Sequence, residues 1–259
     1  MTDPRDLFRR YLGQQIELRQ PGYILPLPLT APAEAAGAAV AAASQPLNRS
    51  AAQPPIPDRG LVIPPPSQDL FAADPLGGKA MPEIERLIHA CTRCTLHAAR
   101  KHAVPGEGPL DAKLVVVGEG PGATEDETGR PFVGRAGELL TDILAAMGCP
   151  RETVYICNVV KCRPPENRKP MADEMEACLP YLHRQLAIIG PRVILAMGAT
   201  AAEALLNTKA SLTALRNKVH DFRGIPLIVT YHPAALLRNP HWKRPTWDDV
   251  RIARRLLDR

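Results

Sequence analysis

The chain has 259 residues, of which 45% are hydrophobic but only 4% aromatic, so any core must be mostly aliphatic. This length accommodates one or two domains of ordinary size. Seven basic and seven acidic residues cancel within residues 1–79, and the net charge of +5 therefore belongs entirely to residues 80–259. A basic domain favours a polyanionic partner such as nucleic acid, although some enzymes without such a partner are also basic.

The sequence contains no run of 18 apolar residues, which excludes a membrane-spanning helix. The first residues include Asp3 and Asp6 within a broken apolar pattern, which is not typical of a signal peptide. We therefore expect a soluble, cytoplasmic, monomeric protein with no membrane partner. In that reducing compartment, the six cysteines are expected to be ligands, nucleophiles or core residues rather than disulfides.

The N-terminal part differs in composition from the rest of the chain. Residues 4–19 carry apolar side chains at helical spacing, which predicts a short amphipathic helix. Residues 21–75 contain twelve prolines and an Ala-rich run, a composition that buries too little surface to offset the entropy of ordering. We predict a Pro/Ala-rich, largely disordered extension over residues 1–80 and a folded domain over residues 81–259.

Four β-rich runs alternate with helical patterns in the folded domain. The predicted strands cover residues 114–118, 154–160, 193–198 and 227–231, and the predicted helices cover residues 136–147, 172–189, 199–206 and 247–257. Continuous apolar runs of this kind are typical of strands buried on both faces. The sequence thus predicts an α/β fold, a three-layer α/β/α sandwich with a four-stranded parallel sheet and a site at the carboxyl ends of its strands.

The first strand runs into a glycine-rich turn. Gly118, Gly120 and Ala123 loosely match the dinucleotide-binding pattern G-x-G-x-x-A. That pattern requires a helix that opens at once and an acid at the tip of the second strand, whereas Pro121 and an expected long polar loop intervene and no such acid is present. Nicotinamide binding is therefore disfavoured, and a plain glycine turn remains an alternative.

The second and fourth strands end in polar residues suited to a site. Asn158 can present a donor and an acceptor to a planar ligand edge, but it can equally be a turn residue. His232 precedes Pro233 at a carboxyl end, where α/β enzymes place their chemistry, although a single histidine is more often structural.

Four cysteines form the other pattern. Cys91 and Cys94 make a C-x2-C pair, and Cys178 follows Cys162 after fifteen residues. Four converging thiolates suit a structural zinc ion or a [4Fe-4S] cluster, and the spacing does not distinguish the two. Four small core residues are the remaining alternative, and packing roles are expected for the other two cysteines, Cys149 and Cys157.

Together these motifs resemble the family 4 uracil-DNA glycosylases, the iron-sulfur branch of that superfamily. The resemblance covers residues 82–258 and rests on four ordered motifs besides the cysteines, namely Gly118-Glu-Gly-Pro-Gly122, Gly129-Arg-Pro-Phe-Val-Gly134, Asn158-Val-Val-Lys-Cys-Arg-Pro-Pro165 and His232-Pro-Ala234. It implies that a [4Fe-4S] cluster is held by Cys91, Cys94, Cys162 and Cys178. It also implies a uracil pocket formed by Glu119, Gly120, Phe132, Asn158 and His232.

The resemblance further implies hydrolysis of the N-glycosidic bond of a uracil flipped out of single- or double-stranded DNA, as in base-excision repair. His232 would donate to the uracil O2, while Glu119 or Asn167 would position water. The matched pocket contains no lysine, so an abasic site without strand cleavage is expected. After the His-Pro turn, Leu236 or Leu237 would enter the gap in the DNA and Arg238 would contact a phosphate, and a helix start packed on the sheet is the alternative for this segment. The basic stretch at residues 216–220 is expected to contact the DNA backbone.

Two further hypotheses remain. A non-enzymatic iron-sulfur protein that binds DNA or senses redox state is the alternative function, and loss of Phe132, Asn158 or His232 would favour it. Ser67-Gln-Asp-Leu-Phe71 faintly resembles the peptides with which bacterial repair proteins dock on the sliding clamp. A tethered peptide of this kind would raise the local concentration of the domain near DNA.

Overall fold

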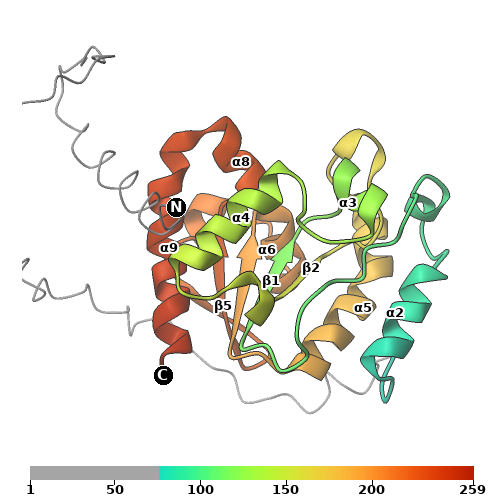
Figure 1. The fold of residues 1–259 in the computed structure, drawn as a ribbon, viewed down its shortest axis with the longest axis horizontal. Helices are drawn as coiled ribbons and strands as arrows, with labels where there is room; N and C mark the ends of the chain where they lie inside the picture. The colour runs from blue at the N-terminus through green and yellow to red at the C-terminus, as the bar shows by residue number, and fades with distance from the viewer. Residues whose placement is uncertain (1–75) are drawn as a thin grey trace, which may run out of the picture.

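The computed structural model describes residues 76–259. The predicted helix at residues 4–19, the Pro/Ala-rich extension and the Ser67–Phe71 segment lie outside the described residues. Within residues 76–259, no helix is long and apolar enough to cross a membrane. Figure 1 shows the described part as a central sheet with helices on both sides.

The sheet contains five strands in the order β2-β1-β3-β5-β4. Its strands are β1 (Leu114–Gly118), β2 (Tyr155–Asn158), β3 (Val193–Met197), β4 (Val219–Phe222) and β5 (Ile225–Thr230). β2, β1, β3 and β5 are parallel neighbours, so their carboxyl ends meet at one edge. The chain passes from β1 to β2 on one side of the sheet and from β3 towards β5 on the other side. The connections after the adjacent strands β1 and β3 therefore run in opposite directions, which opens a crevice between them at the carboxyl edge, where α/β proteins bind ligands.

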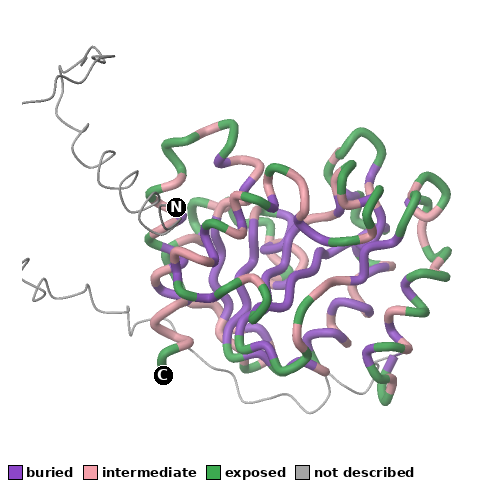
Figure 2. The backbone as a smooth tube through the Cα atoms, viewed as in Figure 1, coloured by how far each residue is buried: buried purple, intermediate pink, exposed green. Residues whose placement is uncertain are grey.

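Alternate residues of the strands supply two separate cores. In β1, Val115 and Val117 pack into the core beneath α2 (Met81–His89), α5 (Ala172–Ile189) and α6 (Ala199–Leu206). Leu114 and Val116 pack into the opposite core, against α4 (Arg135–Ala146), α8 (Pro233–Arg238) and α9 (Lys243–Leu257). Figure 2 shows the strands buried between these layers. The predicted three-layer α/β/α sandwich is therefore confirmed.

Short helices complete the described part of the chain. They are α3 (Ala123–Thr128), α7 (Leu212–Leu215) and the 3₁₀ turns η2 (Thr95–Ala98), η3 (Arg151–Thr153), η4 (Pro165–Asn167) and η5 (Pro240–Trp242). The expectation of a long polar loop after β1 is wrong, because α3 begins at Ala123. Glu125 stabilises this helix start by accepting a hydrogen bond from the Gly122 amide.

The four predicted parallel strands are present, and a fifth strand joins them. β4 pairs antiparallel with β5 across the two-residue turn Arg223-Gly224, in which both residues have positive φ angles of 52° and 85°. Such turns match the twist of a hairpin. The sequence did not predict this strand because it contains the polar residues His220 and Asp221. An edge strand is only half-buried and lacks a continuous apolar run.

A buried aspartate joins α9 to the end of β5. Asp249 accepts hydrogen bonds from Arg216 Nε at 2.6 Å, Thr230 Oγ1 at 2.7 Å and the Asn217 amide at 3.0 Å. Arg216 also lies 4.3 Å over the ring of Tyr231. Its side chain is only 11% exposed and its charge is paired inside the protein, so Arg216 itself does not face outward. Lys218 of the same stretch is exposed, and the expected DNA contact of residues 216–220 stays a prediction for that side chain.

Replacing Asp249 with Ala should lower the free energy of unfolding by about 3–5 kcal/mol, because it leaves the Arg216 charge buried without its carboxylate. Urea denaturation measures this loss. Asp258→Ala is the matched control, because it breaks the exposed Arg254–Asp258 pair and should cost at most about 1 kcal/mol. Equal losses in the two variants would show that the Asp249 network does not anchor the fold.

Candidate active site

A cavity of about 370 Å³ opens at the carboxyl edge of the sheet. It is lined by the loops that follow β1, β2 and β5 and by the segment between α3 and α4. The structure brings together there all the residues predicted for the pocket, namely Glu119, Gly120, Phe132, Asn158 and His232, together with Asn167 and Arg238. None of the residues lining this cavity in the described part of the chain is a lysine.

Asn158 forms part of the cavity wall at the end of β2. It pairs with Gly118 in the β1–β2 ladder, and its side chain is 1% exposed. Within residues 76–259, its Oδ1 is the only fully buried side-chain polar atom without a hydrogen-bond partner. A buried unsatisfied acceptor costs about 1–3 kcal/mol. This oxygen is therefore suited to accept a hydrogen bond from a ligand in the cavity.

Gly118 is required at this position by close packing. A Cβ atom there would lie 2.4 Å from Asn158 Oδ1 and 2.4 Å from Phe132 Cζ. Because both contacts are far inside van der Waals distance, only glycine lets the amide and the aromatic ring approach the end of β1 together. The glycine turn seen in the sequence is thus a packing requirement of the cavity.

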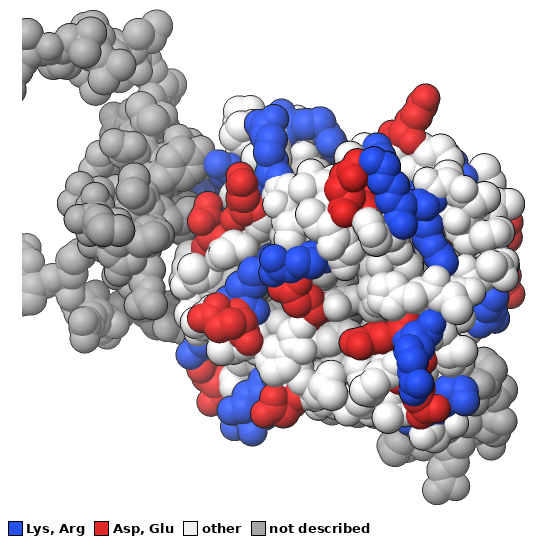
Figure 3. Space-filling model, turned by 45° about the vertical axis from the view of Figure 1, so that its right-hand side comes forward, with Lys and Arg blue, Asp and Glu red and all other residues white. Residues whose placement is uncertain are grey.

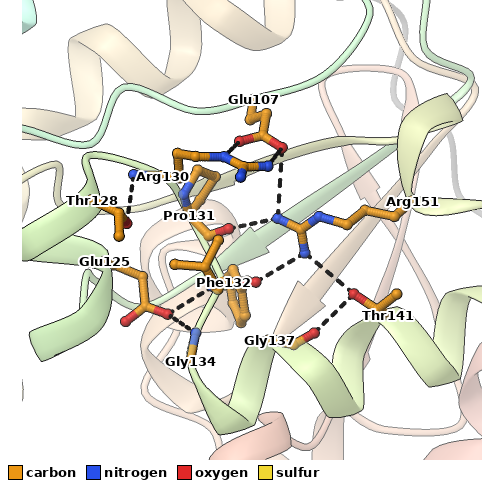
Figure 4. Close-up of polar contacts among 11 residues, drawn as sticks. Glu107, Glu125, Thr128, Arg130, Pro131, Phe132, Gly134, Gly137, Thr141 and Arg151 are labelled. Carbon is orange, nitrogen blue, oxygen red and sulfur yellow. Dashed lines mark hydrogen bonds and ion pairs between the residues drawn. The ribbon is translucent and has the colours of Figure 1, made fainter.

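Phe132 contributes an aromatic wall from the segment between α3 and α4. Its ring centroid lies 5.5 Å from that of His232, with the planes tilted by 31°. Glu125 holds the following backbone, since its Oε1 accepts hydrogen bonds from the amides of Val133 at 2.9 Å and Gly134 at 2.8 Å (Figure 4). Glu125 was not singled out from the sequence, although a glutamate three residues after Gly122 is a helix-start signal.

His232 is the second residue after β5 and caps α8. Its Nδ1 accepts a hydrogen bond from the Ala234 amide at 3.2 Å, which places the proton of the neutral ring on Nε2. Burial is the main cause that lowers the pKa of His232 to about 4, and the nearby Arg238 charge lowers it further. The ring is therefore neutral at pH 7 and offers Nε2–H as a donor.

The other predicted polar residues are held in different ways. Thr200 Oγ1, on α6, donates a hydrogen bond to the Glu119 carboxylate. Asn167 is exposed at the cavity rim, has a positive φ of 56° and accepts a hydrogen bond from Arg163 Nε at 2.9 Å. The backbone of Glu119 is joined to the chain after β2, because its carbonyl accepts from the Val160 amide at 3.1 Å.

Helix α8 places its two leucines differently. Leu236 is 1% exposed and packs in the core with α4 and α9, whereas Leu237 is 40% exposed. The expectation that either leucine enters DNA is therefore narrowed to Leu237, because a core side chain has no free path outward. Arg238 follows and lines the cavity.

Lys161 is a buried cation that sequence reasoning did not single out. Its side chain is 1% exposed, and Nζ donates hydrogen bonds to the Asn158 carbonyl at 2.8 Å and to Gln185 Oε1 at 2.6 Å. Gln185 lies on α5. Lys161 thus connects the peptide of Asn158 to this helix.

The four predicted ligand cysteines line a second cavity, beside α2 and α5. Cys91 follows α2, Cys94 precedes η2, Cys162 follows β2 and Cys178 lies on α5. None of these four cysteines forms a disulfide. Within residues 76–259, no three His, Cys, Asp or Glu side chains are arranged to hold a single metal ion. The other cysteines, Cys149 and Cys157, are buried in the two cores.

Two N–H donors point at these sulfurs. Arg100 Nη1 lies 3.0 Å from Cys162 Sγ, and the Lys161 amide lies 3.3 Å from Cys178 Sγ. Burial raises the pKa of Cys178 to about 12 and also raises the pKa of Cys94 and Cys162. Burial disfavours the thiolate forms, which a bound metal centre and these two donors would stabilise, so the four sulfurs fit a metal centre of the zinc or iron-sulfur kind.

A buried carboxylate connects the two cavities. Glu174 on α5 binds Arg168, which lines the larger cavity, at 2.7 and 2.8 Å, and it accepts a hydrogen bond from Thr95 Oγ1, beside Cys94, at 3.2 Å. Arg168 is the main cause that lowers the pKa of Glu174 to about 2. The cysteine cavity and the rim of the larger cavity are therefore held to the same helix.

The sequence is similar to that of known glycosylases. The family model described as the uracil DNA glycosylase superfamily matches residues 105–253. A type-4 uracil-DNA glycosylase of Thermotoga maritima is 52% identical over 158 residues, which are 60% of this chain and 82% of that protein. Those of Pyrobaculum aerophilum and Archaeoglobus fulgidus are 49% and 41% identical, covering 61% and 67% of this chain and 85% and 91% of those proteins. The chain therefore belongs to the uracil-DNA glycosylase superfamily and, within it, to the type-4 family.

Proposed function

We propose that this protein removes uracil from DNA by hydrolysing its N-glycosidic bond, as the names of its type-4 relatives indicate. The observation that carries the proposal is the unpartnered, buried Oδ1 of Asn158 beside the Phe132 ring. The alternative of a non-enzymatic DNA-binding or redox-sensing protein is not favoured, since Phe132, Asn158 and His232 are all present in one cavity.

Asn158 is the proposed reader of the uracil edge. Uracil presents an N3–H donor beside an O4 acceptor, and one amide answers both, with Oδ1 accepting and the amide nitrogen donating. Cytosine reverses this pattern and would leave buried polar groups unpaired, at about 1–3 kcal/mol each. The hydrogen bond from Lys161 to the Asn158 carbonyl supports this role by limiting movement of the peptide.

The target base must leave the DNA stack to reach this cavity. We propose that the flipped base stacks on the Phe132 ring and that the exposed Leu237 fills the gap that the base leaves in the DNA. We also propose that Arg238 contacts a phosphate. Figure 3 shows basic side chains interspersed with acidic ones on the face that it displays, so the charge excess is not collected into one patch there. Arg238 is exposed and lines the cavity, which supports its proposed contact with the DNA backbone.

His232 is the proposed catalytic donor. Breaking the glycosidic bond leaves an oxocarbenium-like sugar and places negative charge on the departing uracil. The neutral ring donates from Nε2 to O2 and stabilises that charge. Glu119, tied to Thr200, positions the attacking water, and Asn167 at the rim is a second candidate for this role. The absence of a lysine from the described cavity lining supports base removal without strand cleavage.

Cys91, Cys94, Cys162 and Cys178 are proposed to hold a [4Fe-4S] cluster. When bound, the cluster joins the segment after α2 to the segment after β2, and no electron transfer is needed for base removal. The hydrogen bonds from Arg100 and the Lys161 amide to two of the sulfurs support this assignment.

The partner supported by these features is uracil-containing DNA, single- or double-stranded. A monomer satisfies the proposal, since one chain supplies every proposed site residue. Docking of Ser67–Phe71 on a sliding clamp stays a hypothesis about a segment outside the described residues.

Oligonucleotides containing uracil, hypoxanthine or only cytosine test the function and the role of Asn158. Wild-type protein should release uracil and leave alkali-labile sites, whereas Asn158→Asp should lose discrimination against cytosine, because a carboxylate lacks the amide donor. Asn207→Asp is the control, since Asn207 is exposed at the end of α6. Absence of alkali-labile sites from uracil DNA with the wild type would refute the proposed function.

Replacing His232 with Ala should lower the single-turnover excision rate about 100- to 1000-fold, with little change in DNA affinity. Because the pKa of His232 is about 4, the wild-type rate should stay level through pH 6.5 and fall only as the pH approaches 4, where a proton on Nδ1 breaks the hydrogen bond from the Ala234 amide that orients the ring. His89→Ala, which removes an exposed ring at the end of α2, serves as the control. A rate that halves near pH 6.5 would contradict a neutral donor.

Anaerobically purified protein should contain about four irons per chain and absorb broadly in the violet. Cys178→Ser should lose most of this iron, whereas Cys149→Ser should retain it, because Cys149 is buried but does not line the cysteine cavity. Stoichiometric zinc without iron in the wild type would show that the cluster assignment is wrong.

A further inference from the structure

Phe132 adopts a backbone conformation that aromatic residues rarely accept. Its φ is 51°, in the left-handed region, which is a strained conformation for a bulky side chain. The residue is nevertheless 6% exposed and contacts both His232 and the end of β1. Such a conformation persists only where the surrounding contacts hold it.

Arg151 supplies some of these contacts by binding the backbone carbonyl groups of Phe132 and of the residue before it. Nη1 donates a hydrogen bond to the Phe132 carbonyl at 2.9 Å, and Nη2 donates to the Pro131 carbonyl at 2.7 Å. Figure 4 shows the guanidinium facing these two carbonyls from the side opposite Glu125. A planar guanidinium presents its donors as a fork, so one side chain binds two successive peptide groups.

The guanidinium of Arg151 is itself held in place. Its side chain is 18% exposed, and Nη2 lies 3.9 Å from Glu107 Oε1. Glu107 is in turn oriented by Arg130, which binds both carboxylate oxygens at 2.7 and 2.8 Å. The backbone of Glu107 exchanges two hydrogen bonds with Ile156 in β2. Through Glu107, Arg151 is thus connected to β2, the strand that carries Asn158.

The Phe132 carbonyl has no room to move towards α4. A Cβ atom on Gly137 would lie only 1.9 Å from the Phe132 oxygen, so the carbonyl lies directly against the helix backbone. Glu125 binds the next two amides. The peptide groups on both sides of the Phe132 side chain are therefore fixed. Arg151, which contributes to this, does not itself line the cavity.

We propose that Arg151 is a positioning residue that holds the Phe132 ring in the place where it stacks on the base. Binding of the base would then depend on Arg151 through Phe132, without any contact between Arg151 and the base. This inference rests on the proposed function, because it assumes that Phe132 is the stacking face.

The experiment compares Arg151→Met, Arg151→Lys and Phe132→Ala with the double variant Arg151→Met/Phe132→Ala. Inhibition by free uracil and the KM for a uracil-containing oligonucleotide are measured for each. Arg151→Met should raise the inhibition constant about tenfold, because base stacking on an aromatic ring is worth about that factor or more. Arg151→Lys should not restore binding, since an ammonium lacks the planar fork. In the Phe132→Ala background, Arg151→Met should have no further effect.

Arg254→Met is the matched control for a loss of stability. Arg254 Nη1 binds the carbonyls of Met147 and Gly148 at 3.4 and 3.1 Å, immediately beyond the other end of α4. The Arg254→Met variant should have a lower melting temperature, as Arg151→Met should, but an unchanged inhibition constant for uracil. If Arg151→Met does not fold, Arg151→Lys takes its place in the double variant.

The outcomes separate this inference from the proposed function. Uracil excision by the wild type, with weaker uracil binding in Phe132→Ala, supports the proposed function whatever Arg151 does. Equal effects of Arg151→Met with and without the Phe132 ring would overturn the inference, as would a rise in the inhibition constant for Arg254→Met as large as that for Arg151→Met. A wild type that excises no uracil would instead remove the function on which the inference rests.

Discussion

The close approach of Gly118 and Asn158 at the carboxyl edge of the sheet sets the geometry of the cavity. These residues are paired in the β1–β2 ladder, and the missing side chain at Gly118 leaves the space that the Asn158 amide and the Phe132 ring occupy. Hydrogen bonds from the Val159 and Val160 amides to the Gly118 and Glu119 carbonyls then hold the two outgoing segments together. The pocket wall is therefore part of the sheet, which keeps its donors and acceptors fixed before a ligand arrives.

Charged side chains that bind peptide groups stabilise the rest of the cavity. Glu125 accepts from amides, Arg151 donates to carbonyls, and Lys161 donates to the carbonyl of Asn158. A charge-assisted hydrogen bond is stronger than one between neutral groups, and a partly buried charge needs such partners. The same interactions that offset the cost of burying these charges therefore limit the movement of the residues at the site.

The cysteine cavity and the larger cavity share one segment of the chain. Beyond β2, Asn158 contributes to the larger cavity, Lys161 is buried, and Cys162 lines the cysteine cavity. Glu174 connects them a second time, through Arg168 on one side and Thr95 on the other. A group bound by the cysteines would thus restrain the rim of the larger cavity without approaching the base.

The sequence by itself determined the four parallel strands, the helices α5 and α6 to their bounds, and the glycine, asparagine and histidine motifs at the strand ends, because periodicity and turn signals are local properties. Only the tertiary structure decided that β4 joins the sheet edge, that Leu236 is buried while Leu237 is exposed, and that Arg216 binds Asp249 rather than facing outward. It also placed Arg151 against carbonyls about twenty residues away. The physical reason is that an arginine carries the same charge wherever it lies, and its partner is chosen by which backbone groups the packed layers bring within its reach.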